Sequence, residues 1–203
     1  MTTDRSALSR DLLAGGAPWL PYWIGQNLGF PGSGAAAAAL LLALVRLQAW
    51  REFKLFDLAI LVFLTTAALD HAGLRLYPSD SLRRAALPLL LAVSAFGSIA
   101  LRKPCTQQYA REMVAPHWWH NRHFHHVNQV LTAAWGCCFL FMAVLAWVLS
   151  PLTYGRLLTG LVSLILFILC AWLTQVYPRW YRLHRYVPLV RAGKEPFLRS
   201  PRF

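Results

Sequence analysis

Residues 130–150 read VLTAAWGCCFLFMAVLAWVLS and contain no charged side chain. An α-helix rises about 1.5 Å per residue, so about 20 apolar residues cross the roughly 30 Å hydrocarbon core of a bilayer. A second stretch of the same kind, LLTGLVSLILFILCAWLTQVY, occupies residues 157–177. The short segment SPLTYG, residues 150–155, separates the two stretches. Together they predict two membrane-spanning helices joined by a turn.

Further apolar runs precede this pair. Residues 11–30 are rich in proline, glycine and tryptophan, which suits an interface better than a regular helix, so we expect a short, imperfect span or an interfacial segment there. The runs are too continuous for the alternating pattern of a membrane barrel. The sequence therefore predicts an all-α fold, a polytopic transmembrane helical bundle with five or six spans in a single membrane domain, residues 1–203. The remaining predicted spans are 34–50, 55–74 and 85–101.

The composition points to lipid as the solvent of this chain. Hydrophobic residues make up 57% of its 203 residues and charged residues only 14%, whereas a soluble domain carries about a quarter. The formal net charge is +12. The basic residues cluster in short segments between apolar runs, which fits anionic lipid headgroups. We expect no nucleic-acid partner.

The distribution of basic residues predicts the orientation. Three basic segments, residues 46–54, 102–128 and 178–203, fall on one side of the membrane if the predicted spans alternate. Lysine and arginine are enriched in cytoplasmic connections. We therefore expect a cytoplasmic loop at 102–128 and a basic, cytoplasmic C-terminal tail at 178–203.

The loop contains the segment HWWHNRHFHH, residues 117–126, with five of the seven histidines. If the segment is helical, His117, His120 and His123 lie three residues apart, and such spacing can bring two of them to a transition metal or a haem. Histidine and tryptophan also suit headgroup depth without any metal. We expect the interfacial role and no cofactor, and keep the metal or haem site as the alternative.

Three ionisable residues lie within the predicted span 55–74. An ionisable side chain inside a membrane is a functional candidate because its desolvation is costly. We expect Asp57 to pair with Lys54, and Asp70 and His71 to reach the opposite interface. The alternative is a small transporter or channel whose polar path is lined by Asp57 and Asp70.

The segment RKPCTQQYARE, residues 102–112, is the most distinctive polar stretch. It predicts the end of a span followed by a short interfacial helix capped by Thr106. Beyond it, Asn128 and Trp135 are seven residues apart and so lie on one helix face. The candidate partner-binding or structural residues are Lys103, Pro104, Gln107, Arg111, Glu112, Asn128 and Trp135. Arg111 is expected to pair with Gln107 or Gln108.

Small residues predict where helices approach closely. Gly34 and Ala38, and likewise Ala35 and Ala39, form small-xxx-small pairs, the pattern that lets transmembrane helices pack at short range. Such packing could also join copies of the chain into a homo-oligomer.

The order of these features resembles the intracellular septation protein A family of small bacterial inner-membrane proteins. The resemblance covers about residues 20–178 and begins with Leu20-Pro21, followed by the basic connection at 46–54. It continues with Lys103, Pro104, Gln107 and Glu112, then Asn128, Trp135 and Phe139, and a last apolar run with a basic tail. The histidine segment and the length of the tail are not part of the family's pattern.

This resemblance implies a non-enzymatic, multi-pass protein of the bacterial inner membrane. Such a protein supports cell-envelope growth, septation or membrane integrity through envelope or division proteins of the same membrane. Two other hypotheses stay open from the residues alone. One is a metal- or haem-linked redox or transport protein that uses the histidine segment, and the other is the small transporter or channel.

Overall fold

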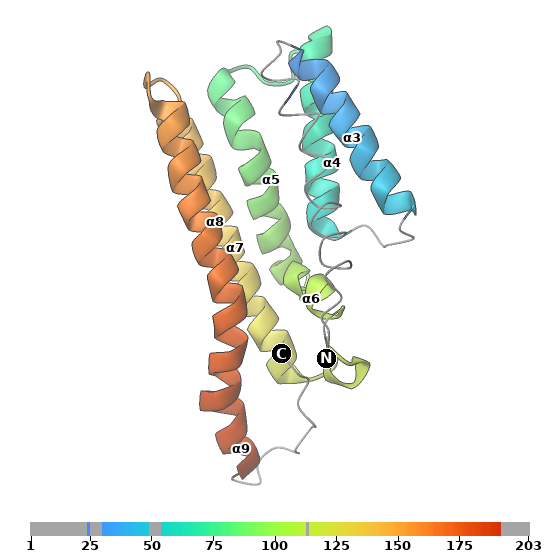
Figure 1. Ribbon diagram of the computed structural model, residues 1–203, viewed down its shortest axis with the longest axis vertical. Helices are drawn as coiled ribbons and strands as arrows, with labels where there is room; N and C mark the ends of the chain where they lie inside the picture. Colours follow the sequence, from blue (N-terminus) through green and yellow to red (C-terminus); the bar gives the residue numbers. More distant parts are fainter. Residues whose placement is uncertain (1–23, 25–29, 49–53, 113, 192–203) are drawn as a thin grey trace. The chain divides into compact units, whose positions relative to one another are not determined.

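The computed structural model describes residue 24 and residues 30–48, 54–112 and 114–191. Most of the predicted segment 11–30 and the end of the predicted tail lie outside these residues. The described residues are helical and contain no strand (Figure 1). The elements are α3 (Pro31–Gln48), α4 (Leu55–Leu69), the π-helical turn η1 (Asp70–Leu74), α5 (Asp80–Ala100), α6 (Cys105–Ala110), the 3₁₀ turn η2 (Pro116–Trp118), α7 (Arg122–Val148), α8 (Gly155–Tyr181), the π-helical turn η3 (Arg182–Tyr186) and α9 (Val187–Arg191).

Four helical stretches of the described residues are long and apolar enough to cross a membrane. They are Leu55–Leu74, Asp80–Ala100, Arg122–Val148 and Leu157–Val190. A shorter apolar helix covers Pro31–Leu44. The all-α class is confirmed, and the chain has the helices of a membrane protein. Five or six spans stay a prediction, since α3 is short and residues 11–30 are mostly outside the described part.

The chain divides into two compact units, residues 1–90 and 91–203. In the first unit, α3 packs against α4 through its small residues. Ala35 and Ala38 are fully buried and belong to one core with Phe63 and Leu64 of α4. Without large side chains between them, the two backbones approach closely. The close packing predicted from the small-residue pairs is confirmed.

The end of α4 is also set by local chemistry. Gly73 in η1 has a φ of 106°, a conformation that glycine adopts without steric cost. The chain then turns, and the hydroxyl of Ser79 accepts a hydrogen bond from the backbone N–H of Leu82, at 3.2 Å. Ser79 therefore caps α5.

In the second unit, α7 and α8 form a helical hairpin. The turn between them is so tight that a Cβ added to Gly155 would lie 1.7 Å from the carbonyl oxygen of Leu149. Along the hairpin, the indole N–H of Trp135 donates to the Thr174 hydroxyl at 3.0 Å, and its ring meets Phe167 edge-on. Most large apolar side chains of α8 are exposed, as expected of a lipid-facing helix.

Several helices begin earlier than predicted. Helix α5 begins at Asp80, not at residue 85, and α7 begins at Arg122, not near residue 130, so the end of the predicted loop 102–128 is helical. The predicted tail is helical as far as Arg191. Hydropathy detects the apolar length of a helix, whereas its backbone hydrogen bonds continue into polar residues. The start of α7 is fixed by Asn121, whose side-chain oxygen accepts from the N–H of His123 at 2.7 Å.

Candidate functional site

The histidine segment does not form one continuous surface. His117 lies in η2, and His123, His125 and His126 lie in the first turns of α7. His117, His120 and His126 are exposed, whereas His123 is only 8% exposed. His123 is therefore the member of the segment that is built into the protein interior.

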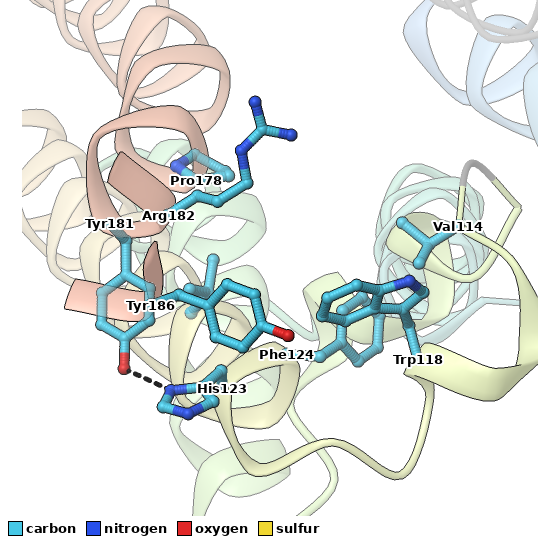
Figure 2. Close-up of a pocket in the computed structure, with 9 residues that line it drawn as sticks. Val114, Trp118, His123, Phe124, Pro178, Tyr181, Arg182 and Tyr186 are labelled. Carbon is cyan, nitrogen blue, oxygen red and sulfur yellow. Dashed lines mark hydrogen bonds between the residues drawn. The ribbon is translucent and has the colours of Figure 1, made fainter. Parts of the chain in front are cut away.

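The surroundings of His123 are aromatic (Figure 2). Its Nδ1 shares a hydrogen bond of 3.0 Å with the hydroxyl of Tyr181, and its ring meets Tyr186 edge-on at 5.3 Å between centroids. Trp118 packs against the other side of Tyr186 at 5.7 Å. These rings join the first turn of α7, the end of α8 and η2 into one cluster.

A cavity of about 60 Å³ lies within this cluster. We call it the His123 pocket. Its walls are Val114, Trp118, His123, Phe124, Val127, Pro178, Tyr181, Arg182 and Tyr186. The side chains are mostly aromatic or aliphatic, and Figure 2 shows the Arg182 stem beside the rings, with its guanidinium extending away from them. The pocket is thus an apolar hollow with a basic edge.

The π-helical turn η3 explains how two tyrosines reach one pocket. In an α-helix, residues five apart point about 140° away from each other, at roughly 100° per residue. A π-helical turn closes its hydrogen bonds between residues i and i+5 and so winds more loosely. Tyr181 and Tyr186 therefore both face His123, and both rings contact it. Such turns occur often at functional sites.

The charge around the pocket is strongly positive. Glu112 is the one acidic residue in the sequence between positions 91 and 191. Arg122 of α7, Arg179 of α8 and Arg185 of η3 are exposed close to the pocket in the sequence. An anion is therefore favoured at this end of the second unit, and a cation is not.

The predicted metal ligands are not gathered by the structure. Within the described residues, no group of three or more His, Cys, Asp or Glu side chains is arranged to hold a metal ion. His117 instead lies beside the Trp118 ring, and His123 bonds to Tyr181. The metal or haem site stays a prediction.

The segment 102–112 contributes to a second buried cluster, which we call the α6–α7 joint. The hydroxyl of Thr106 donates to the carbonyl oxygen of Asn128 at 2.8 Å and lies 2.8 Å from the hydroxyl of Thr132. The N–H of Cys105 donates to the hydroxyl of Ser98 at 3.0 Å. The joint consists of Ser98, Cys105, Thr106, Asn128 and Thr132.

Thr106 was expected to cap α6, and this prediction is wrong. Helix α6 begins after Pro104 without a side-chain cap, because the Thr106 hydroxyl is used between helices. Burial of Cys105 in the joint raises the pKa of its thiol. Thr106 and Cys105 thus tie α6 to its neighbours.

Other residues of the predicted motif have separate places. The side-chain amide of Asn128 donates to the carbonyl of Phe124, at 2.8 Å, inside α7. The guanidinium of Arg111 lies over the ring of Trp119, 5.3 Å from its centroid, and the Gln107 amide donates to the Trp119 carbonyl at 3.5 Å. Pro104 is buried, whereas Lys103 and Glu112 are exposed. The motif is therefore mostly internal packing, with Lys103, Arg111 and Glu112 on its surface.

The intramembrane polar residues lie at the two ends of α4. The carboxylate of Asp57 accepts from the backbone N–H of Lys54 at 3.1 Å, so it stabilises the start of the helix. At the other end, the Asp70 carboxylate accepts from the N–H of Tyr77 at 2.9 Å and lies 3.7 Å from the Arg83 guanidinium. His71 packs against Gly32. Both carboxylates are thus placed to fix helix ends.

Sequence reasoning missed Trp118, Tyr181, Arg182 and Tyr186 as site residues. A usable signal was present in YPRWYRLHRY, residues 177–186, where aromatic and basic residues alternate directly after an apolar run. This composition is typical of headgroup depth. The sequence predicts a basic cytoplasmic tail at residues 178–203, whereas Tyr181, Arg182 and Tyr186 belong to the end of α8 and to η3, which pack against α7.

Comparison with known proteins gives no relative from which a role could be transferred: no protein-family model, curated protein or solved structure matches this chain.

Proposed function

We propose that the chain is a non-enzymatic, multi-pass protein of the bacterial inner membrane that supports envelope growth or septation through protein partners. The loop around α6 and the C-terminal segment are cytoplasmic in this proposal, because they hold most of the basic residues. The role in envelope growth or septation comes from the family resemblance. The proposed action through protein partners is argued from the residues around α6.

The observation that carries the proposal is the α6–α7 joint. Its polar atoms bond to one another across two helices, and Asn128 and Thr132 are almost completely buried. Buried hydrogen-bonded groups of this kind fix the relative position of elements. The distinctive motif therefore serves to hold a shape, which supports a role in assembly.

The exposed parts of the same region supply a surface for partners. Lys103, Gln108, Arg111 and Glu112 are exposed around α6. A fixed shape in the joint and accessible polar side chains beside it are what a docking element in the cytoplasm requires. We expect division or envelope membrane proteins to contact this surface.

The test is genetic. Deletion of the gene in its bacterial host should give longer cells and higher sensitivity to low osmolarity, measured by microscopy and by survival after dilution. The wild-type chain and the variant H117A/H120A, which changes two exposed residues, should restore both properties. The joint variant N128L/T132V should not restore them, although it is inserted in the membrane.

Normal length and normal osmotic survival of the deletion strain would overturn the proposal. If N128L/T132V is shown to be disrupted at the joint and still restores both properties fully, the joint no longer supports the proposed function.

A further inference from the structure

We propose that the His123 pocket is a binding site for one anionic phospholipid of the surrounding leaflet. The phosphate lies at the basic edge near Arg182, and the neighbouring apolar part of the lipid enters the cavity between the rings. This inference goes beyond the proposed function and does not depend on it.

The depth of the pocket fits this ligand. Pro178 and Tyr181 follow directly after the apolar run that ends at residue 177, and His123 and Phe124 precede the run that starts at residue 130. Both sides of the pocket thus lie just beyond the hydrocarbon length of their helices. Aromatic residues with polar tips are favoured at this headgroup level.

The charge selects the ligand further. The surrounding arginines are opposed by a single acidic residue in the second unit's described sequence, Glu112. Basic residues near a membrane attract anionic lipids, and a zwitterionic headgroup gains less binding free energy from them. Charge complementarity therefore favours a phospholipid with net negative charge.

The size and lining determine which part of the lipid enters. The cavity of about 60 Å³ has room for only a few water-sized groups, which is too little for a whole phospholipid headgroup. Its walls are mainly aromatic and aliphatic, and the polar groups among them belong to Trp118, His123, Tyr181, Arg182 and Tyr186. The Arg182 stem packs along these walls while its guanidinium extends outward (Figure 2), as long basic side chains do at membrane interfaces.

The experiment measures lipid binding to the full chain in detergent by native mass spectrometry. Phosphatidylglycerol and phosphatidylcholine with the same acyl chains are titrated separately. We expect one phosphatidylglycerol to bind at least about tenfold more tightly than phosphatidylcholine. The R182Q variant should weaken this step about fivefold, the size of one basic contact near a membrane surface.

The matched control is R185Q, which removes the same charge from an exposed residue of η3 that does not line the pocket. We expect less than a twofold change. Equal losses in R182Q and R185Q would overturn the proposal, because they would show attraction to general positive charge and no defined site.

Two further arms keep the test decisive. V127F fills the cavity without changing its charge, and it should weaken the binding of phosphatidylglycerol as much as R182Q does. If V127F does not fold, V127L replaces it, since it adds a smaller apolar group at the same wall of the cavity. Unchanged binding in the folded variant would overturn the proposal.

The last arm separates a lipid from free phosphate. Inorganic phosphate at millimolar concentration should not displace phosphatidylglycerol, because it offers nothing to the apolar walls. Displacement would assign the site to a soluble anion and overturn the lipid proposal. A deletion strain without a division phenotype would leave these binding results unaffected, so the two proposals fail separately.

Discussion

The α6–α7 joint and the His123 pocket both include residues from the first half of α7, yet their side chains make different kinds of contact. In the joint, hydroxyl and backbone groups meet each other at hydrogen-bond distance and leave little for a ligand. In the pocket, rings meet edge-on around a cavity, and one side-chain hydrogen bond, His123 to Tyr181, spans the two helices. We infer from this difference that the joint contributes mainly to the stability of the fold and that the pocket is the region able to bind a ligand.

The largest effect is expected from breaking the joint. In N128L/T132V, the Thr106 hydroxyl loses its Thr132 partner and the Phe124 carbonyl loses the Asn128 amide. The Thr106 hydroxyl keeps its bond to the backbone carbonyl of residue 128, so the variant loses hydrogen bonds but does not leave this hydroxyl unpaired. Each lost hydrogen bond costs about 0.5–1.5 kcal/mol, so the double variant should lose about 1–3 kcal/mol of unfolding free energy. Unfolding in sodium dodecyl sulfate, followed by circular dichroism, measures the loss.

Thr65→Val is the matched control for the joint. The Thr65 hydroxyl donates only to the Leu61 carbonyl of its own helix, at 2.8 Å, and the residue is exposed. We expect a change below about 0.5 kcal/mol. A joint variant that is no less stable than this control would remove the contrast between the two regions.

The thiol of Cys105 reports on the joint directly. Burial raises its pKa, so at neutral pH less of it is the reactive thiolate than in an exposed cysteine. In a variant whose other three cysteines are alanine, alkylation by a water-soluble maleimide should be slow at pH 7.5 and rise only at higher pH. The Thr132 hydroxyl lies 4.0 Å from the Cys105 sulfur and lowers the pKa of the thiol, so adding T132V should raise this pKa further and slow alkylation at pH 7.5. Equal rates with and without T132V would show that the Thr132 hydroxyl does not act on this thiol.

A smaller effect on stability is expected in the pocket. Y181F removes one hydroxyl and its hydrogen bond to His123, which should cost about 0.5–1.5 kcal/mol. The control is Y154F at the opposite end of α8, where the side chain is 78% exposed. Thermal unfolding of both variants should show a lower midpoint for Y181F and no shift for Y154F. If Y181F loses as much unfolding free energy as the joint variant, the pocket contributes as much to stability as the joint does, and the contrast between the two regions is wrong.

The smallest effect is expected from the exposed histidines. H117A/H120A should change the unfolding free energy by less than about 0.5 kcal/mol. Elemental analysis and a visible spectrum of purified wild type and variant should agree, without stoichiometric metal or a haem band. Metal or haem present in the wild type and lost in the variant would favour the cofactor hypothesis.

The sequence predicted the helical class and the apolar centre of each long helix. It did so because a hydrocarbon-length apolar run has few alternatives to a helix. The packing of Ala35 and Ala38 against α4 was also predictable from the sequence, since close helix packing requires side chains of that size. Hydropathy could not give the start of α7, because the cap by Asn121 is a hydrogen bond within a polar segment.

The pocket was not predictable from its parts. His123 and Tyr181 are 58 residues apart and meet only because α7 and α8 pair along their full length. The rings of Tyr181 and Tyr186 share a side only through the π-helical turn, and no residue pattern in the segment specifies that turn. Thr106 shows the same limit, because the cap it could supply locally competes with a bond to α7 that the sequence does not reveal.

The turn that ends at Gly155 also sets the order in which the second unit assembles. Helices joined by a short connection close into a hairpin at little entropic cost, and pairing then spreads away from the turn. The bond between Trp135 and Thr174 forms partway along this path, and the contact of His123 with Tyr181 lies at its far end. We therefore expect the pocket to be completed last during folding and to open first when the hairpin frays, before the rest of the helix pair separates.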